Sequence, residues 1–445
     1  MALKSAKQER LALNQYAEVL ESKAAKYWDI DKMRINTGKI RDYEVLKKIG
    51  RGRYSEVFAG KHLPSNKKVV MKILKKVNIK QVKREIKALQ VLAGGPHIVQ
   101  FLDFLFNERT HAPCLVFDYV PNIYWKDLYP KLTLSDIRQY IGQLFQALDF
   151  AHSRGLIHRD VKPHNILIDH NLGNLWLADW GISQFYFPLR EYDLKVCSRN
   201  YKGPELLVGD VMYDYTLDCW GAGCVMTGMI FMMEPFFRGA DDVDQLVKIV
   251  SVLGWERLHT YLDTYSLELE AHVKERVSGL RGQPWTSFID AVNQDKARNR
   301  YALDLIDSLL RYDPADRMHP AQALMHSFFI LDDEDGDGDG EGDCDGDGDG
   351  DGDGDGDGDG DGDGDGDGDG DGDDHHMGDG DGDDDGDGDG AGAGDGDGDG
   401  ADAGAGSSND NGDVHGDGAD LEPVMDVDLS PETVRGLKRQ RCEKK

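Results

Sequence analysis

The segment HRDVKPHNILID, residues 158–169, decides the fold class of this chain. It follows an apolar stretch with helical spacing and precedes a run of β-forming residues. Asp160 and Asn165 lie five positions apart, with Lys162 between them. Phosphoryl transfer needs a carboxylate to orient the attacking hydroxyl, a cation for the moving phosphate and an oxygen ligand for Mg²⁺. The segment therefore predicts a phosphotransferase site in which these three side chains are catalytic.

A second acidic group follows at a fixed distance. Asp179 opens the tripeptide DWG, fourteen residues after Asn165. Mg²⁺ prefers oxygen ligands and takes few of them from protein when a phosphate supplies the others. We therefore expect Asn165 and Asp179 to be the metal ligands.

A glycine-containing turn lies near the start of the folded part, in IGRGRYSEVFAG at 49–60. Gly50 and Gly52 separate two β-type runs, and such a turn lets backbone N–H groups approach phosphates. Ser55 stands where the third glycine of a GxGxxG motif is usual, and Val57 offers an apolar contact for a nucleotide base. Taken alone, the stretch is equally compatible with an ordinary β-hairpin turn.

A lysine interrupts the apolar run VVMKIL. Lys72 lies 22 residues after Gly50 and 13 residues before Glu85, which falls in an expected helix over 80–92. Strand alternation alone would permit Lys72 to face solvent. A strand lysine that pairs with a helix glutamate and contacts phosphates is the more specific interpretation.

Together these motifs resemble the protein kinase domain in its Ser/Thr form, with GPE at 203–205 where APE is usual. Ser55, Trp180, Gly203 and the segments KREIKAL and SRNYKGPELLVGDVMYDYTLDCW make the chain similar to the catalytic alpha subunit of casein kinase II over about 26–330. The resemblance implies an α+β, two-lobed protein kinase fold. The expected kinase domain spans 43–330, with a β-rich N-lobe at 43–116, a hinge at 117–121 and an α-rich C-lobe at 122–330.

The resemblance also implies roles for individual residues. Lys72 and Glu85 form the phosphate clamp, Asp160 is the catalytic acceptor, and Lys162 contacts the γ-phosphate. ATP is the expected nucleotide, with GTP as a second one, and Mg²⁺ is the expected metal. The implied nucleotide-binding residues are Gly50, Gly52, Ser55, Val57, Val70, Lys72, Glu85, Phe117, Asp118 and Val120.

Two basic clusters bear on substrate choice. In the family that the chain resembles, such clusters bind acidic residues around the target Ser or Thr. Several cations around one groove favour acidic peptides. The first cluster is thinned, because Asn78, Ile79 and Gln81 replace expected lysines. For this first cluster, a solvated helix face is the alternative. The predicted substrate-recognition residues are Lys75, Lys76, Lys80, Lys83 and Arg84, then Lys195, Arg199 and Lys202.

The N-terminal extension, 1–42, carries a loose apolar stripe that predicts a helix over about 5–27. KYWD at 26–29 resembles the stretch that the family packs against its activation segment, residues 179–205 here. The resemblance therefore implies an enzyme that is active without phosphorylation of that segment.

The C-terminal part, 331–445, is an Asp-Gly repeat with a basic end. It holds 44 acidic and 6 basic residues, so it accounts for the chain's net charge of -32 while residues 1–330 are mildly basic. With almost nothing apolar to bury, this tail is expected to be disordered. The alternatives to an active kinase are a pseudokinase scaffold and a protein that binds basic partners through this tail.

Further expectations concern partners and location. Acidic protein substrates and a dimeric regulatory beta subunit, giving a heterotetramer, are implied by the resemblance. The β-type surface with Tyr43, Val45, Phe58, Met71 and Ile73 resembles the beta-docking site, although core residues give the same pattern. We expect no membrane segment and no specific nucleic-acid partner. LKRQR at 437–441 is compatible with nuclear import, so nucleus and cytoplasm are the expected locations.

Overall fold

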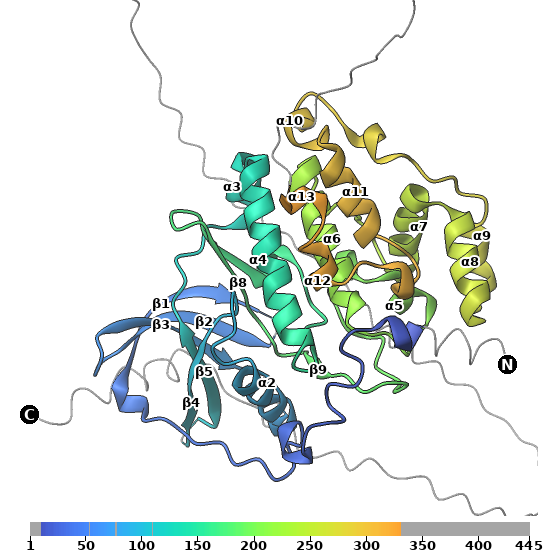
Figure 1. Ribbon diagram of the computed structural model, residues 1–445. Coiled ribbons are helices and arrows are strands. Elements are labelled where there is room, and N and C mark those ends of the chain that lie inside the picture. Colours follow the sequence, from blue (N-terminus) through green and yellow to red (C-terminus); the bar gives the residue numbers. More distant parts are fainter. Residues whose placement is uncertain (1–9, 53, 76–77, 109, 331–445) are drawn as a thin grey trace, which may run out of the picture. The chain divides into compact units, whose positions relative to one another are not determined.

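The computed structural model describes residues 10–52, 54–75, 78–108 and 110–330 (Figure 1). These residues form a β-rich N-lobe and a helical C-lobe, so the predicted α+β two-lobed fold is confirmed. The Asp-Gly tail, Lys76 and the LKRQR segment lie outside the described residues. Among the described residues, no helix combines the length and apolar character that crossing a bilayer requires.

The N-lobe is a five-stranded antiparallel sheet with strand order β1-β2-β3-β5-β4. Alternation along β3 buries Val69, Met71 and Ile73 on one face and directs Lys72 to the other. This alternation is what brings the predicted lysine to the cleft side of the sheet. The strands are β1 (Tyr43–Arg51), β2 (Ser55–His62), β3 (Lys67–Leu74), β4 (Phe101–Asn107) and β5 (Ala112–Asp118).

Helix α2 (Ile79–Val91) packs against the cleft side of this sheet. Its N-cap is Asn78, whose side-chain oxygen accepts a hydrogen bond from the Lys80 backbone N–H. Its buried stripe includes Val82 and Ile86, which contact Leu115 on β5 through one apolar cluster. Glu85 lies on the same stripe, so the helix carries a carboxylate into the interior.

The C-lobe is built around α6 (Thr216–Phe231), in which every residue is buried. Helix α4 (Leu134–His152) packs against it and begins with a capping box between Thr133 and Asp136. The other helices are α3 (Trp125–Leu128), α5 (Pro204–Val208), α7 (Asp242–Leu253), α8 (Trp255–Tyr265), α9 (Ala271–Val277), α10 (Gln294–Ala297), α11 (Arg300–Leu309), α12 (Pro320–Ala323) and α13 (Ser327–Ile330).

Two short β ladders hold the loops of the predicted site. β7 (Ile166–Asp169) pairs with β8 (Asn174–Leu177) in antiparallel fashion. HRDVKPHN comes directly before β7 and DWG comes shortly after β8, so both segments lie at the same end of this ladder. β6 (Leu156–Ile157) pairs with β9 (Gln184–Phe185) and joins the start of that loop to the activation segment. The chemistry-bearing segments are therefore anchored by backbone hydrogen bonds on both sides.

Within the described residues, the helix predicted over 5–27 is confirmed for residues 10–13 and is wrong for the residues that follow. After a short helical stretch ending near Leu13, the chain forms successive turns and a 3-10 helix at Ala25–Tyr27. The backbone hydrogen bonds here span three residues, as from Ala17 N to Asn14 O. Ala17 and Leu20 are nearly fully buried against the C-lobe, and this tertiary packing outweighs the weak helical pattern.

Candidate active site

The catalytic loop brings Asp160, Lys162 and Asn165 together. Asp160 Oδ2 accepts hydrogen bonds from Asn165 Nδ2 at 2.9 Å and from Lys162 Nζ at 2.9 Å. Asn165 Nδ2 also donates to the Asp160 backbone oxygen at 2.8 Å, which fixes the amide orientation. One carboxylate, one ammonium group and one carboxamide therefore converge at a single point of the cleft.

Ser198 completes this arrangement, and the sequence interpretation did not assign it to the site. Its Oγ donates to Asp160 Oδ1 at 2.9 Å and accepts from Lys162 Nζ at 2.6 Å. Its backbone N–H also donates to Asp160 Oδ1 at 3.0 Å. Ser198 lies 38 residues from Asp160, so only the return of the activation segment reveals the contact.

The strand lysine and the helix glutamate form the predicted pair. Lys72 Nζ lies 2.9 Å from Glu85 Oε1 and 2.7 Å from Asp179 Oδ1. Burial alone would lower the pKa of Lys72, but the charges of Glu85 and Asp179 outweigh it and hold the pKa above its usual range. Lys72 is therefore a permanent cation at the junction of the lobes. Strand alternation alone would have allowed it to face solvent, but it does not.

Two oxygen groups in the cleft suit a hard divalent cation. Because Asn165 donates through Nδ2, its carboxamide oxygen remains available, and the Asp179 side chain is 48% exposed. Burial raises the pKa of Asp179, while Lys72 lowers it by more, so this carboxylate is ionised. Within the described residues no three His, Cys, Asp or Glu side chains are arranged to hold a metal. The donor set fits a cation such as Mg²⁺ that also takes phosphate oxygens as ligands.

The glycine turn joins β1 to β2 over the same side of the N-lobe. Gly50 pairs with Val57 across the two strands, and Gly52 N donates to Ser55 O at 2.9 Å. A side chain on Gly52 would lie 3.2 Å from Ser55 Oγ, tighter than most such contacts. Ser55 is buried, and Val57 opposes Lys72 on β3. The turn, the apolar contact and the lysine therefore belong to one continuous surface.

The predicted hinge residues follow the end of β5. Val70 on β3 opposes Phe117 on β5. The Phe117 ring packs edge-on against the Phe101 ring, with 6.0 Å between the ring centroids. Asp118 is the last residue of β5, and Val120 O accepts a hydrogen bond from the N–H of Asn122. The structure thus places these residues at the connection between the lobes, where the resemblance put the hinge.

A buried carboxylate on α6 fixes the backbone of the HRD motif. Asp218 accepts hydrogen bonds from His158 N at Oδ2 and from Arg159 N at Oδ1, at 2.8 Å each, and His152 Nε2 lies 2.9 Å from Oδ2. Arg159 has φ of 65°, a left-handed conformation that costs energy in a residue other than glycine. Asp218 therefore stabilises the strained turn that presents Asp160.

Arg159 of the HRD motif is hydrogen-bonded to uncharged groups of the C-lobe. Its Nε donates to Ile182 O at 2.7 Å, and its Nη1 donates to the Tyr213 hydroxyl at 3.0 Å. The Tyr213 hydroxyl in turn donates to Asp193 O in the activation segment at 2.8 Å. Hydrogen bonds thus connect the HRD arginine to the activation segment directly at Ile182 and through Tyr213 at Asp193.

The predicted substrate-recognition residues divide into two groups. Lys75 Nζ lies 3.3 Å from Glu56, Lys202 Nζ lies 2.6 Å from Asp242, and Arg199 donates to Ala240 O. Within the described residues, by contrast, no ion pair is formed by Lys83, Arg84 or Lys195. Lys80 and Arg84 line a cavity of about 440 Å³ between α2, the activation segment and residues 28–31.

The stretch at 26–29 contacts the activation segment. The Trp28 ring packs edge-on against the Phe187 ring, with 5.3 Å between the ring centroids. The Tyr27 and Phe185 rings pack edge-on as well, with their centroids 6.0 Å apart. The Lys26 backbone oxygen accepts a hydrogen bond from Lys87 Nζ on α2 at 2.7 Å. One short segment therefore touches both the activation segment and the helix that carries Glu85.

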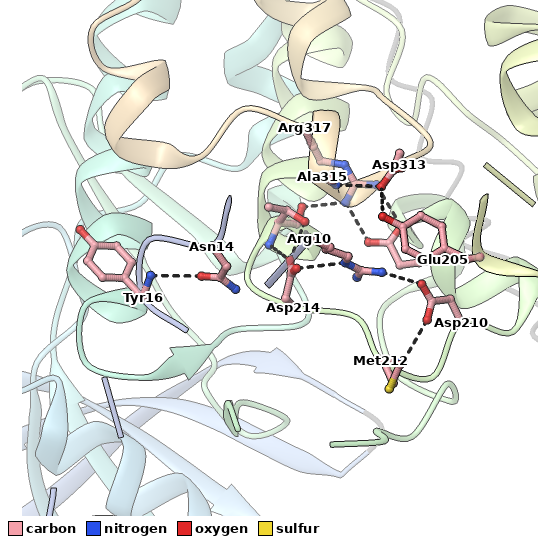
Figure 2. Close-up of polar contacts among 12 residues, drawn as sticks. Arg10, Asn14, Tyr16, Glu205, Asp210, Met212, Asp214, Asp313, Ala315 and Arg317 are labelled. Atoms are coloured by element: carbon pink, nitrogen blue, oxygen red, sulfur yellow. Dashed lines mark hydrogen bonds and ion pairs between the residues drawn. The ribbon is translucent and has the colours of Figure 1, made fainter. Parts of the chain in front are cut away.

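Two buried arginines form ion pairs at and just beyond the C-terminal end of the activation segment (Figure 2). Arg10 is 7% exposed and lies 2.7 Å from Asp210 and 3.3 Å from Asp214. Arg317 and Glu205, the glutamate of GPE, are bonded at 2.8 Å with both side chains fully buried. Sequence pattern offered no signal for Arg10, since its partners lie 200 residues away.

The apolar residues of the suggested docking surface are mostly covered. Val45, Phe58, Met71 and Ile73 are at most 5% exposed and belong to one buried cluster. Tyr43 is partly buried against that cluster, and its hydroxyl donates to Asp103 at 3.0 Å.

Comparison with known families matches residues 43–329 to the protein kinase domain. That range contains the glycine turn, the Lys72–Glu85 pair, the catalytic loop and Asp179 in the geometry described above. Members of this family transfer phosphate from ATP with the help of a divalent metal. The chain therefore belongs to the protein kinase family and is a phosphotransferase.

Proposed function

We propose that this kinase is a Ser/Thr kinase of the casein kinase II alpha type, which transfers the γ-phosphate of ATP to hydroxyls flanked by acidic residues. The observation that carries the proposal is the complete constellation of Lys72–Glu85, Asp160, Asn165 and Asp179. A pseudokinase scaffold has no need to keep all these groups in contact. Mg²⁺ is the proposed metal, and GTP is proposed as a second nucleotide on the resemblance alone.

The geometry supports a simple division of work. Asp160 accepts the proton of the attacking hydroxyl, and its orientation is fixed by hydrogen bonds from Ser198 and Asn165. Lys162 contacts the transferring phosphoryl group, and Lys72 contacts the nucleotide phosphates. Asn165 and Asp179 would hold the Mg²⁺, which supplies charge neutralisation when bound.

The proposed preference for acidic targets rests on uncompensated charge. Arg84 on α2 and Lys195 in the activation segment are exposed and form no ion pair within the described residues. Lys75 and Lys202, in contrast, already have carboxylate partners at 3.3 and 2.6 Å. We therefore expect acid recognition to depend on Arg84 and Lys195 more than on Lys75 and Lys202.

A peptide comparison tests this preference. Two serine peptides, flanked by aspartates or by arginines, are phosphorylated by the full chain, and kcat/KM is measured for each. We expect the acidic peptide to be preferred, and Arg84→Gln to reduce its kcat/KM by roughly tenfold through loss of one charge-assisted contact. Arg281→Gln, an exposed arginine on the C-lobe, is the matched control and should change neither value. Equal rates on both peptides would reject acid-directed specificity.

Assembly and location follow from the resemblance and are part of the proposal. We propose acidic protein substrates, a dimeric regulatory beta subunit that gives a heterotetramer, and activity in nucleus and cytoplasm. Gel filtration of the kinase with a purified beta subunit would test the assembly. Binding of basic partners by the tail is a separate candidate activity that concerns residues outside the described part of the chain.

A further inference from the structure

Two cations of the second basic cluster are bound by the chain itself. Arg199 Nη1 donates to Ala240 O at 2.6 Å, and Lys202 Nζ lies 2.6 Å from Asp242 Oδ2. In a kinase that selects acidic targets, such groups would bind carboxylates of the substrate. The chain thus already supplies to Lys202 the kind of group that a substrate would supply.

The segment that carries Asp242 is held in place by several hydrogen bonds. Asp241 caps helix α7, and its side chain accepts a hydrogen bond from a backbone N–H of the first helical turn at 2.7 Å. Gln245, which is fully buried, accepts from Gly239 N at 2.9 Å and donates to Asn200 O at 3.2 Å. Asp242, the first residue of α7, is therefore a fixed carboxylate beside the cluster.

The stability of helix α7 alone does not account for the position of this carboxylate. Acidic side chains in a first helical turn interact favourably with the helix dipole, and Asp244 as well as Asp242 has such a position. The cap is supplied by Asp241, however, while Asp242 contacts Lys202 on the neighbouring segment. The Asp242 side chain is 57% exposed and that of Lys202 is 13% exposed, so the carboxylate is the outer member of the pair.

Lys202 lies close to the catalytic acceptor. Ser198, whose N–H donates to Asp160 Oδ1, is followed by the single 3-10 turn Arg199–Tyr201 and then by Lys202. Because a 3-10 turn rises about 2 Å per residue, the Lys202 backbone lies within roughly 10 Å of Ser198. An extended peptide advances about 3.3 Å per residue, so side chains next to the target hydroxyl are in reach of Lys202.

We propose that Asp242 is a specificity-determining residue that occupies the acid-binding position of Lys202 and so weakens the preference for an acidic residue next to the target Ser or Thr. A substrate carboxylate must displace Asp242 to reach the ammonium group. It also meets the negative charge of Asp241, which is exposed beside Asp242, and like charges at an interface disfavour binding. The inference rests on the proposed function, because it concerns a kinase that selects acidic substrates.

Peptides with single aspartates test the proposal on the full chain. Serine peptides carry one aspartate directly before the serine, directly after it or three positions after it, in a common background with two aspartates farther along. The value of kcat/KM for each peptide, divided by that for an alanine peptide, is the acid preference at that position. Asp242→Asn should raise this preference about three- to tenfold at one of the two adjacent positions, because Lys202 becomes available for a charge-assisted contact. The preference three positions away should change less than about twofold.

A double-mutant cycle ties the effect to Lys202. In the Lys202→Gln background, Asp242→Asn should no longer change the preference next to the target. A purely structural contribution of Asp242 to α7 would alter Tm, or the rates on all peptides alike, and would leave this ratio unchanged. Partial unfolding of a variant cancels from the ratio as well. Glu275→Gln removes an exposed carboxylate on α9 and is the control, which should leave every preference unchanged.

Two results would overturn the proposal. One is an unchanged preference at both adjacent positions in Asp242→Asn, and the other is a gain that persists in the Lys202→Gln background. A failure of the proposed function is distinguishable from these results. A wild type without acid preference at any position would contradict the proposed function alone if Asp242→Asn gains such a preference, and both claims if it does not.

Discussion

At the scale of single residues, Glu234 is the carboxyl group with the clearest pH dependence. Its Oε1 accepts a hydrogen bond from Tyr201, while Oε2 has no partner among the described residues. Burial raises its pKa to about 8, and the Tyr201 hydrogen bond opposes this only in part. In the unfolded chain a glutamate titrates near 4.3. The folded state therefore binds more protons between these values, and stability is lost as pH rises through them.

Glu234→Gln should remove this loss. Between pH 5 and pH 8, Glu234 ionises in the unfolded chain while it stays largely protonated in the folded protein. We expect this difference to lower the unfolding free energy of the wild type by up to about 3 kcal/mol over that range, and we expect no such decrease in the glutamine variant. Urea unfolding at several pH values measures the difference, with Tyr201→Phe as a control that keeps the titrating group. A wild type and variant with parallel pH profiles would contradict the assignment.

Several site residues could be predicted individually because their spacing encodes their chemistry. Asp160, Lys162 and Asn165 share one loop, and Lys72 and Glu85 are brought together by adjacent elements. The ion pair of Lys75 could not be predicted, because its partner Glu56 lies on β2, 19 positions earlier in the sequence. Ser198 was missed for the same reason, because its contacts with Asp160 depend on how the activation segment returns to the loop.

At the scale of elements, the N-terminal segment, residues 10–29, packs against the activation segment and the chain that follows it. Arg10 pairs with Asp210 and Asp214, and Trp28 packs on Phe187 within the activation segment. The predicted helix does not form in residues 14–24, because each turn follows the surface of the C-lobe. The periodic pattern shows which residues of the segment are apolar. Whether these residues pack on the C-lobe as a helix or as successive turns depends on the shape of the C-lobe surface.

Arg10→Gln should loosen this element. Removing one partner of a buried ion pair leaves Asp210 and Asp214 uncompensated, which typically costs about 3–5 kcal/mol. Burial raises the pKa of Asp214, but Arg10 and hydrogen bonds from Thr216 lower it by more, so the stabilisation exists above the unfolded value of about 3.9 and fades below it.

Unfolding free energies of wild type and Arg10→Gln between pH 7 and pH 3 measure this effect. The difference should be full at pH 6 and shrink below about pH 4. Lys39→Gln, an exposed change in the same extension, is the control and should leave stability within about 0.5 kcal/mol. A difference that does not vary with pH would mean that Arg10 stabilises by packing alone.

At the scale of the whole kinase domain, polar contacts join the two lobes on either side of the catalytic cleft. Lys72 from the sheet contacts Asp179 of the C-lobe, and the backbone oxygen of Lys26 accepts a hydrogen bond from α2. Arg159 already has protein partners in Ile182 and Tyr213. We therefore expect this kinase to be active without phosphorylation of the activation segment.

The two-lobed architecture itself could be predicted, because a run of β-type segments precedes a run of helical ones and the motifs fall at their junctions. The strand order, with β5 between β3 and β4, is a tertiary property that alternation does not encode. The full burial of α6, by contrast, could have been predicted from the sequence, because a helix that is largely apolar on all sides has no face to expose to water.

The central claim is that this assembled site transfers phosphate. We would measure ³²P transfer from ATP to an aspartate-flanked serine peptide by the full chain, and compare it with Asp160→Asn. The account predicts rapid transfer by the wild type and a loss of at least about a thousandfold in kcat for Asp160→Asn, with both proteins equally folded by circular dichroism. No transfer by a folded wild type, or equal transfer by the two proteins, would contradict it.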